Sequence, residues 1–167
     1  MEITRLTDTS IRIKTKTATF VIDPNLKTEA DVTLIMQSEE SDPNLVENAR
    51  LVIDGPGDYE VMDVAITGIK YGDYVGYSID DGSSKILIVP STVAEKEKDE
   101  EGYTALIIKG VLGFDLSKVS SYSADICLVF GDQMNLDHAT ESAKVSKINI
   151  RKIDETLKGQ VVVLRKE

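Results

Sequence analysis

The run Val32-Thr33-Leu34-Ile35-Met36 is almost continuously apolar and stops abruptly at a polar loop. Such a run predicts a strand buried on both faces, because a strand with one wet face alternates apolar and polar residues. The loop that follows, residues 37–42, is rich in side chains that can bind a ligand. We therefore expect a layered β structure in which this loop ends a buried strand, a common way to build an active site.

Short strands also fill the chain before this run. Residues 3–6 and 11–14 alternate apolar and polar side chains, and residues 18–22 are rich in β-branched ones, ending at Asp23-Pro24. Turn-forming residues separate the three segments. This pattern predicts an antiparallel meander.

The remaining chain predicts more strands and a few short helices. Residues 74–79 and 85–89 flank the turn 80–83 and predict a hairpin. The other expected strands are 51–53, 64–69, 103–109, 124–130, 147–153 and 160–164. The expected helices are 43–50, capped by Asp42 or Ser41, then 116–123 and 136–145. This order predicts packed sheets with helices outside them.

Composition narrows the functional classes. The chain has 167 residues, 41% of them hydrophobic, and a net charge of −10. We expect a single domain, 1–167, that binds neither nucleic acid nor membrane, because its charge repels both. A single cysteine excludes an internal disulfide, and the N-terminus has no signal-peptide core. A cytoplasmic location is the expectation.

Several strings resemble the metallo-β-lactamase superfamily, especially its small lactonase-like hydrolases. The opening to Asp23-Pro24, the segment Ala30-Asp31-Val32-Thr33, and the string from Val52 through Gly55-Pro56-Gly57 to Val61 carry the likeness. The resemblance implies an α+β fold, a four-layer αββα sandwich, here with a shortened second half.

The metal ligands of that superfamily do not carry over. Its His-x-His-x-Asp-His frame falls on Gln37, Glu39, Ser41 and Asp42, and the chain has one histidine, His138. The other ligand positions fall on Thr7-Asp8, near Tyr71-Gly72-Asp73, on Pro90-Ser91 and near Ile153. Zinc prefers imidazole, thiolate and carboxylate ligands, so an oxygen-only set does not suit it. The resemblance thus implies a vestigial cleft of Asp8, Gln37, Glu39, Ser41, Asp42, Asp73 and Ser91.

Three functional hypotheses remain open. The first is a degenerate, metal-free and non-catalytic protein that acts as a binding or assembly module, with itself as a homo-oligomer or with another protein. The second is a hydrolase with an altered metal or mechanism, in which Asp8, Glu39, Asp42 and Asp73 bind a hard divalent cation such as Mg²⁺, Ca²⁺ or Mn²⁺, or act as acid and base. The third is a subunit whose partner completes the site.

Other candidate residues have structural interpretations. We expect Glu40 to belong to a solvated acidic loop, and His138 to lie on the surface at the start of a helix. Cys127 lies in an apolar strand and is expected to be a buried thiol. The string Asp54-Gly55-Pro56-Gly57-Asp58 predicts a turn rather than a phosphate loop. Tyr71, Tyr74 and Tyr77 are expected to pack on a sheet, with a pocket or interface lining as the alternative.

Overall fold

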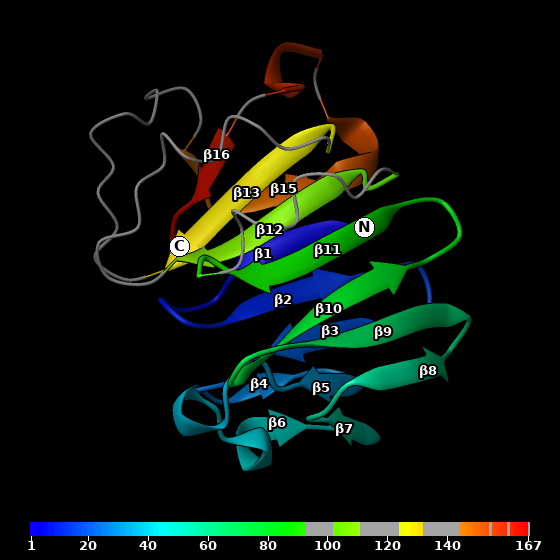
Figure 1. The fold of residues 1–167 in the computed structure, drawn as a ribbon, viewed down its shortest axis with the longest axis vertical. Coiled ribbons are helices and arrows are strands. Elements are labelled where there is room, and N and C mark those ends of the chain that lie inside the picture. Colours follow the sequence, from blue (N-terminus) through cyan, green and yellow to red (C-terminus); the bar gives the residue numbers. More distant parts are fainter. Residues whose placement is uncertain (93–101, 111–123, 132–143, 154, 160, 167) are drawn as a thin grey trace.

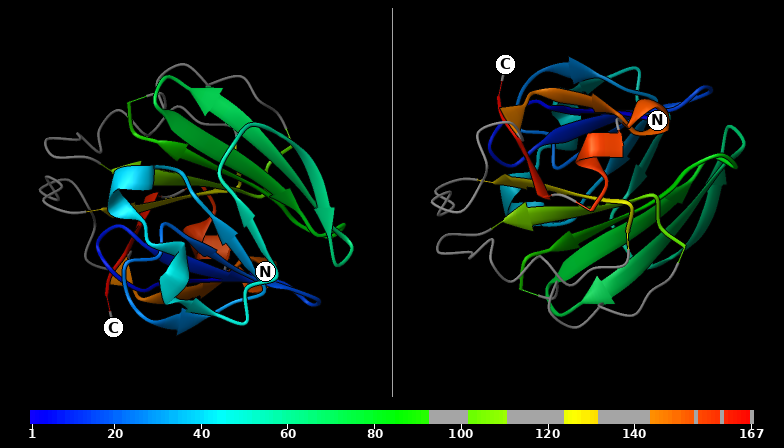
Figure 2. Two further views of the ribbon diagram at one scale, coloured as in Figure 1. Left: turned by 90° about the horizontal axis from the view of Figure 1, so that it is seen from below. Right: turned by 90° about the horizontal axis from the view of Figure 1, so that it is seen from above.

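In the computed structural model, residues 1–167 are described except 93–101, 111–123, 132–143, 154, 160 and 167. Two β-sheets pack face to face (Figure 1). Figure 2 shows them as separate layers, with the blue to cyan strands of one sheet facing the green strands of the other. The two buried layers of the expected sandwich are therefore present.

The first sheet has six strands and comes mostly from the N-terminal part of the chain. Its order is β15-β1-β2-β3-β5-β7. The strands are β1 (Glu2–Arg5), β2 (Ile11–Lys14), β3 (Thr19–Ile22), β5 (Val32–Leu34), β7 (Leu51–Ile53) and β15 (Lys147–Asn149). The expected meander β1–β2–β3 is antiparallel, while β3, β5 and β7 run parallel.

The second sheet has eight strands, in the order β14-β16-β13-β12-β11-β10-β9-β8. They are β8 (Gly57–Val61), β9 (Val64–Tyr71), β10 (Tyr74–Asp80), β11 (Lys85–Pro90), β12 (Ala105–Gly110), β13 (Ile126–Gly131), β14 (Lys144–Val145) and β16 (Val161–Leu164). The predicted hairpin β10–β11 is confirmed, and β11, β12, β13 and β16 run parallel. The second half is the larger sheet, so the expected shortening was wrong.

The expected α+β four-layer sandwich is also wrong for the described part of the chain. The helices described there are 3-10 turns of three residues, at Ser38–Glu40, Pro43–Leu45, Ile150–Lys152 and Glu155–Leu157. Residues 43–50, predicted to be helical, form one such turn and then β6 (Val46–Glu47), which pairs with β4 (Thr28–Glu29). The predicted helices 116–123 and, apart from Lys144–Val145 in β14, 136–145 lie outside the described residues.

Asp42 acts as an N-cap, as predicted, although the helix predicted after it does not form. The Asp42 carboxylate accepts a hydrogen bond from the Asn44 N–H at 3.0 Å, as an N-cap does. Pro43 favours one turn, but Val46 is buried with Val21 and Ala30 against the outer face of the first sheet. Extended backbone at Val46 allows this packing, so tertiary contacts override the local helix signal.

The main core lies between the two sheets. It contains the inward side chains of both, including Ile3, Phe20, Leu34, Tyr77 and Ile107. A second apolar cluster lies on the other face of the large sheet, with Leu87, Ile108 and Cys127 among its buried members. The central strands β11, β12 and β13 are thus buried on both faces. No helix among the described residues is long and apolar enough to cross a membrane.

Candidate functional site

The ends of the parallel strands of the two sheets meet at one side of the sandwich. Asp23 follows β3, Gln37 and Glu40 follow β5, Ser91 follows β11, and Lys109 is the penultimate residue of β12. We call these five residues the strand-end site. Lys109 and Asp23 are 86 positions apart in the chain, yet their charged groups are bonded. The site therefore joins the carboxyl ends of strands from both layers.

Asp23 is the centre of this site. Its side chain is fully buried, and its backbone has a positive φ of 44°. Aspartate tolerates this left-handed conformation better than most residues. The Oδ1 atom accepts hydrogen bonds from the backbone N–H groups of Met36, at 2.8 Å, and Gln37, at 3.2 Å. These bonds attach the start of the polar loop to the end of β3.

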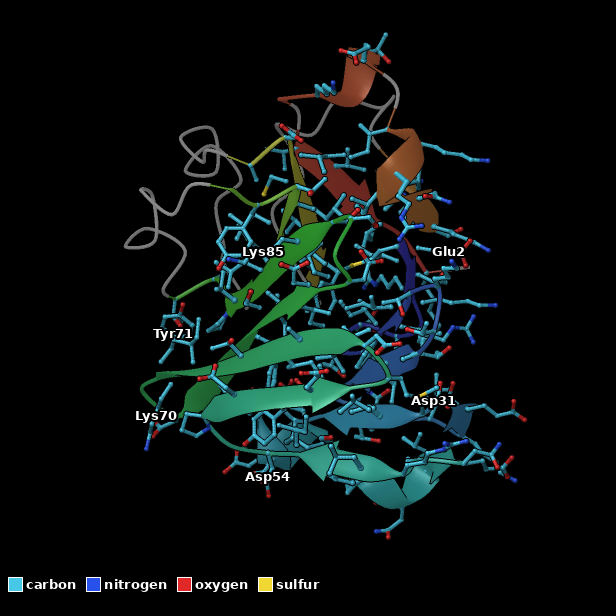
Figure 3. All side chains as sticks on the ribbon, turned by 90° about the vertical axis from the view of Figure 1, so that its right-hand side faces the viewer. Glu2, Asp31, Asp54, Lys70, Tyr71 and Lys85 are labelled. Atoms are coloured by element: carbon cyan, nitrogen blue, oxygen red, sulfur yellow. The ribbon has the colours of Figure 1, made fainter. Side chains whose placement is uncertain are left out.

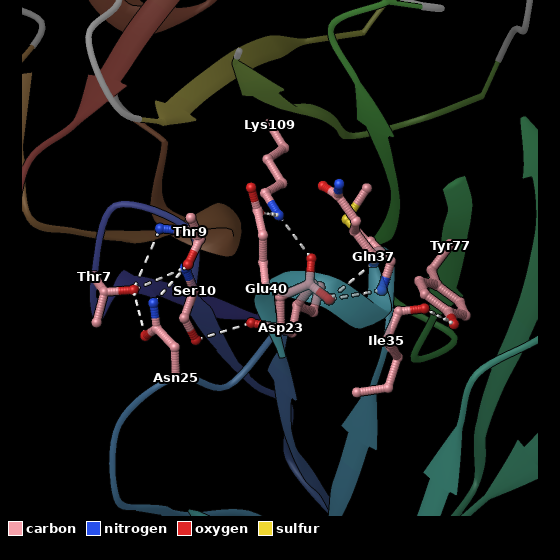
Figure 4. A network of polar contacts seen from close by, with 12 residues as sticks. Thr7, Thr9, Ser10, Asp23, Asn25, Ile35, Gln37, Glu40, Tyr77 and Lys109 are labelled. Atoms are coloured by element: carbon pink, nitrogen blue, oxygen red, sulfur yellow. Dashed lines mark hydrogen bonds and ion pairs between the residues drawn. The ribbon is translucent and has the colours of Figure 1, made fainter. Parts of the chain in front are cut away.

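Lys109 supplies the positive charge. Its side chain is only 5% exposed, and its Nζ atom lies 2.8 Å from Asp23 Oδ2 and 2.5 Å from Glu40 Oε2 (Figure 4). Every residue of β12 is buried. An ammonium at the end of such a strand has to find a partner within the protein. Two carboxylates are its partners: that of Asp23 is fully buried and that of Glu40 is partly exposed.

Burial shifts the pKa values of Asp23 and Lys109 in opposite directions. Burial raises the pKa of the Asp23 carboxyl, and the Lys109 ammonium and the two N–H groups counteract this rise only in part. Burial lowers the pKa of Lys109, but Asp23 and Glu40 together outweigh burial and raise it above its ordinary value. Lys109 is therefore a cation at neutral pH and not an amine nucleophile.

A second buried cation lies beside the strand-end site. The Arg5 guanidinium donates to the carbonyls of Thr7, Leu164 and Gly131 and to Asp8 Oδ1, the last at 2.6 Å. Gly131 is paired with Gly110, the neighbour of Lys109. Asp8, one of the predicted cleft residues, is thus bonded to the arginine that ends β1, three positions before it.

Among the described residues, no hydrogen bond or ion pair joins Asp8 to the other predicted cleft residues. Gln37 reaches Asp23 through its backbone, and Ser91 donates its N–H to the Lys109 carbonyl at 2.9 Å. Glu39 is exposed, Asp42 caps a 3-10 turn, and Asp73 is exposed at the β9–β10 turn. Ser41 carries a buried hydroxyl with no hydrogen-bond partner in the described structure. Of the predicted set, only Gln37 and Ser91 belong to the strand-end site.

The residues at this position do not fit a zinc ion. Across the described ranges, no three His, Cys, Asp or Glu side chains are grouped as metal ligands. Moreover, the two carboxylates that follow β3 and β5 already hold the Lys109 ammonium of β12, whose charge repels a metal cation. The donor chemistry therefore matches an internal ion pair.

The aromatic and thiol candidates have structural positions. Tyr77 is fully buried, and its hydroxyl lies 2.7 Å from the Ile35 carbonyl and 3.0 Å from that of Ile53, at the ends of β5 and β7. Tyr71 packs against the outer apolar cluster. Cys127 is buried, as expected, and burial raises the pKa of its thiol. His138 lies outside the described residues.

Sequence reasoning missed Asp23, Lys109 and Arg5 as a connected group. Each had a local signal. Asp23 directly follows a buried strand, Lys109 ends an apolar segment, and Arg5 is the charged residue of an alternating segment. A charged residue inside an apolar run is a sign of a buried partner. The identity of the partner, however, depends on which strands the fold brings together.

No protein-family model and no curated protein matches the chain. Solved structures do. One described as a Zn-dependent hydrolase of the metallo-β-lactamase superfamily from Thermotoga maritima has a TM-score of 0.72 and 17% identity, with 98% of each chain covered. The isothiocyanate hydrolase from Delia radicum gut bacteria has a TM-score of 0.60 and 10% identity, with 99% of this chain and 97% of that chain covered.

A third similar structure is the metallo-β-lactamase fold protein YhfI from Bacillus subtilis. Its TM-score is 0.56 at 10% identity, with 99% of this chain and 96% of that chain covered. Such low identities report on architecture and not on chemistry. The sequence resemblance is confirmed at that level: this chain has the metallo-β-lactamase fold.

Proposed function

We propose that this chain is a metal-free, non-catalytic protein of the metallo-β-lactamase fold that acts as a binding or assembly module. One observation carries the proposal. An ammonium of the protein itself, that of Lys109 on the second sheet, bonds two carboxylates that follow strands of the first sheet. In hydrolases that use a metal ion, the ion polarises the attacking water. A lysine ammonium held by two carboxylates provides charge balance without that chemistry.

The position of Glu40 strengthens the argument. It belongs to the loop after β5, where the resemblance placed the metal ligands of the superfamily. That loop is held by Asp23 through two backbone bonds and by Lys109 through Glu40. The loop thus has a defined structural role without a metal, and its exposed surface is available to a partner.

The alternative of a hydrolase with a carboxylate-based cation site has the similarity to hydrolase structures in its favour. It requires Asp8, Glu39, Asp42 and Asp73 to come together. The Asp8–Arg5 pair and the exposed, separate settings of the other three favour the metal-free proposal instead. Homo-oligomer formation and a partner that completes the site remain proposals within the binding-module reading.

Metal analysis is the direct test. The protein is purified, incubated with zinc, iron(II), manganese and magnesium in separate samples, dialysed, and analysed by inductively coupled plasma mass spectrometry. We expect far less than one metal per chain in each sample. Near-stoichiometric metal in the wild type would overturn the proposal. The Lys109→Ala variant is measured in parallel, because it shows whether Asp23 and Glu40 can hold a cation once the ammonium is gone.

A further inference from the structure

A charged groove lies on the outer face of the first sheet. The β4–β6 ribbon covers Val21 on this face, with Ala30 and Val46 buried against it. Beside the ribbon lie Glu2 of β1 and Arg12 and Lys14 of β2. The groove between them has a volume of about 400 Å³, which lies within the usual size range of small-molecule sites.

Two cations on β2 line one part of this groove without partners. Arg12 is half-buried and Lys14 is exposed, and the side chain of neither has a hydrogen bond or ion pair with another described residue. The neighbouring Lys147 is different, because its Nζ atom lies 2.9 Å from Glu2. A half-buried guanidinium without an acceptor is unusual, since its donors lose water on burial and gain nothing in return.

Two carboxylates line another part of the groove. Asp31 Oδ2 accepts the Thr19 N–H at 2.8 Å, and its Oδ1 atom has no partner in the described structure. Glu29, at the end of β4, is exposed and unpaired there as well. Figure 3 shows Glu2 and Asp31 on the same side of the molecule. The groove therefore offers unpaired groups of both signs.

We propose that this groove binds a small zwitterion, such as a free amino acid or a short peptide with both ends charged. The planar guanidinium of Arg12 fits a carboxylate in a bidentate manner, with Lys14 adding charge. The free oxygen of Asp31, with Glu29 nearby, accepts hydrogen bonds from an ammonium group. A plain anion would face these carboxylates, and a plain cation would face Arg12, so a ligand with both charges suits the groove best.

This site is separate from the strand-end site. Strand β3 begins with Thr19 at the groove and ends with Ile22 beside Asp23, so the two sites lie at opposite ends of the same strand. Substitutions of Arg12 and Asp31 leave the Lys109 ion pair in place. Failure of the groove proposal would therefore leave the metal-free proposal standing, and the converse is also true.

The test is a titration of the full chain at pH 7, followed by ¹⁵N amide chemical shifts. Triglycine is the zwitterionic probe, citrate the anionic one and putrescine the cationic one. We expect triglycine to shift the amides of β2 and of residues 29–31, with a Kd of about 1 mM, and each single-sign probe to bind more weakly. A charged hydrogen bond contributes enough that Arg12→Gln and Asp31→Asn should each weaken triglycine binding by about tenfold.

The matched control is Lys16→Gln, since Lys16 is exposed in the β2–β3 turn and does not line the groove. It should bind triglycine as the wild type does. Three results would overturn the proposal. They are no shift at about 10 mM triglycine, equal binding by Arg12→Gln and wild type, or citrate binding as tight as triglycine, which would indicate a simple anion site.

Discussion

Replacing Lys109 by methionine tests the central ion pair, because methionine keeps most of the side-chain length and removes the charge. Loss of the ammonium destabilises the protein mainly through Asp23 and much less through Glu40. Asp23 is fully buried, so water cannot replace the ammonium, whereas Glu40 is 39% exposed and returns to water. Removing one partner of a buried ion pair costs about 3–5 kcal/mol. The partly exposed Glu40 bond adds less than about 1 kcal/mol.

This loss is large enough to measure by urea unfolding and by thermal unfolding, each followed by far-ultraviolet circular dichroism. In a chain of 167 residues, each kcal/mol corresponds to about 2–4 °C in Tm, so we expect Tm to fall by about 6–20 °C. The matched control is Lys70→Met on β9, where the lysine is exposed. Its free energy of unfolding should stay within about 0.5 kcal/mol of the wild type.

The pH dependence gives the experiment a second readout. Burial already raises the pKa of Asp23, and Lys109 opposes that rise, so Lys109→Met raises the pKa further. A carboxyl whose pKa is higher in the folded state than in the unfolded state contributes its full stability at pH values below the unfolded-state pKa of about 3.9. That contribution is lost as pH rises through the folded-state pKa. The free energy of unfolding that Lys109→Met loses relative to the wild type should therefore be smaller at pH 5.5 than at pH 8.

Two results would refute this reasoning. One is a Lys109→Met variant within about 1 kcal/mol of the wild type at pH 8, which would mean that Asp23 does not depend on the ammonium. The other is an equal loss of unfolding free energy at both pH values, which would mean that the loss comes from packing rather than from charge. The double variant Asp23→Asn/Lys109→Met separates these cases further, because it removes the buried charge and should recover part of the stability.

Three further predictions concern other buried groups. Tyr77→Phe should lower the free energy of unfolding by about 1–3 kcal/mol, because it leaves the Ile35 carbonyl without its hydroxyl donor, whereas Tyr74→Phe should change little in the same urea assay. Gly131→Ala should cost at least about 2 kcal/mol in that assay, since a Cβ there would lie 2.4 Å from the Gly110 carbonyl oxygen and the backbone has a φ of 153°; a wild-type stability would contradict the close approach. Cys127 should react with a thiol reagent such as Ellman's only at the rate of unfolding, because it is buried and its pKa is raised, and prompt reaction of the native protein at pH 8 would contradict this.

Local patterns predicted most of the strands. The alternation in residues 11–14 and the turn at 80–83 specified β2 and the β10–β11 hairpin, because period and turn chemistry are local properties. The pattern failed at 43–50, where burial of Val46 against Val21 decides the conformation. The resemblance predicted two packed sheets correctly and the helical layers incorrectly for the described part of the chain.

The candidate site was less predictable for a different reason. The loop after Met36 was identified as its location, and Gln37 and Ser91 were named, but the charged pair at its centre was not. A bond between residues 86 positions apart depends on strand order, and strand order is not a local property. Aligning the chain with the ligand pattern of the superfamily also pointed to Glu39 and Asp42. The buried carboxylate, that of Asp23, lies outside that pattern.

The burial of Asp23 explains why a lysine is needed here at all. Its carboxylate connects β3 to the loop after β5 through two backbone N–H groups, so removing the acid would release that loop. A buried carboxylate in turn requires a compensating positive charge. A metal ion could supply it only with several more ligands, which the described strand ends do not provide. One lysine at the end of a fully buried strand satisfies the same electrostatic requirement with a single side chain. The Lys109–Asp23 pair thereby links the strand ends of the two sheets.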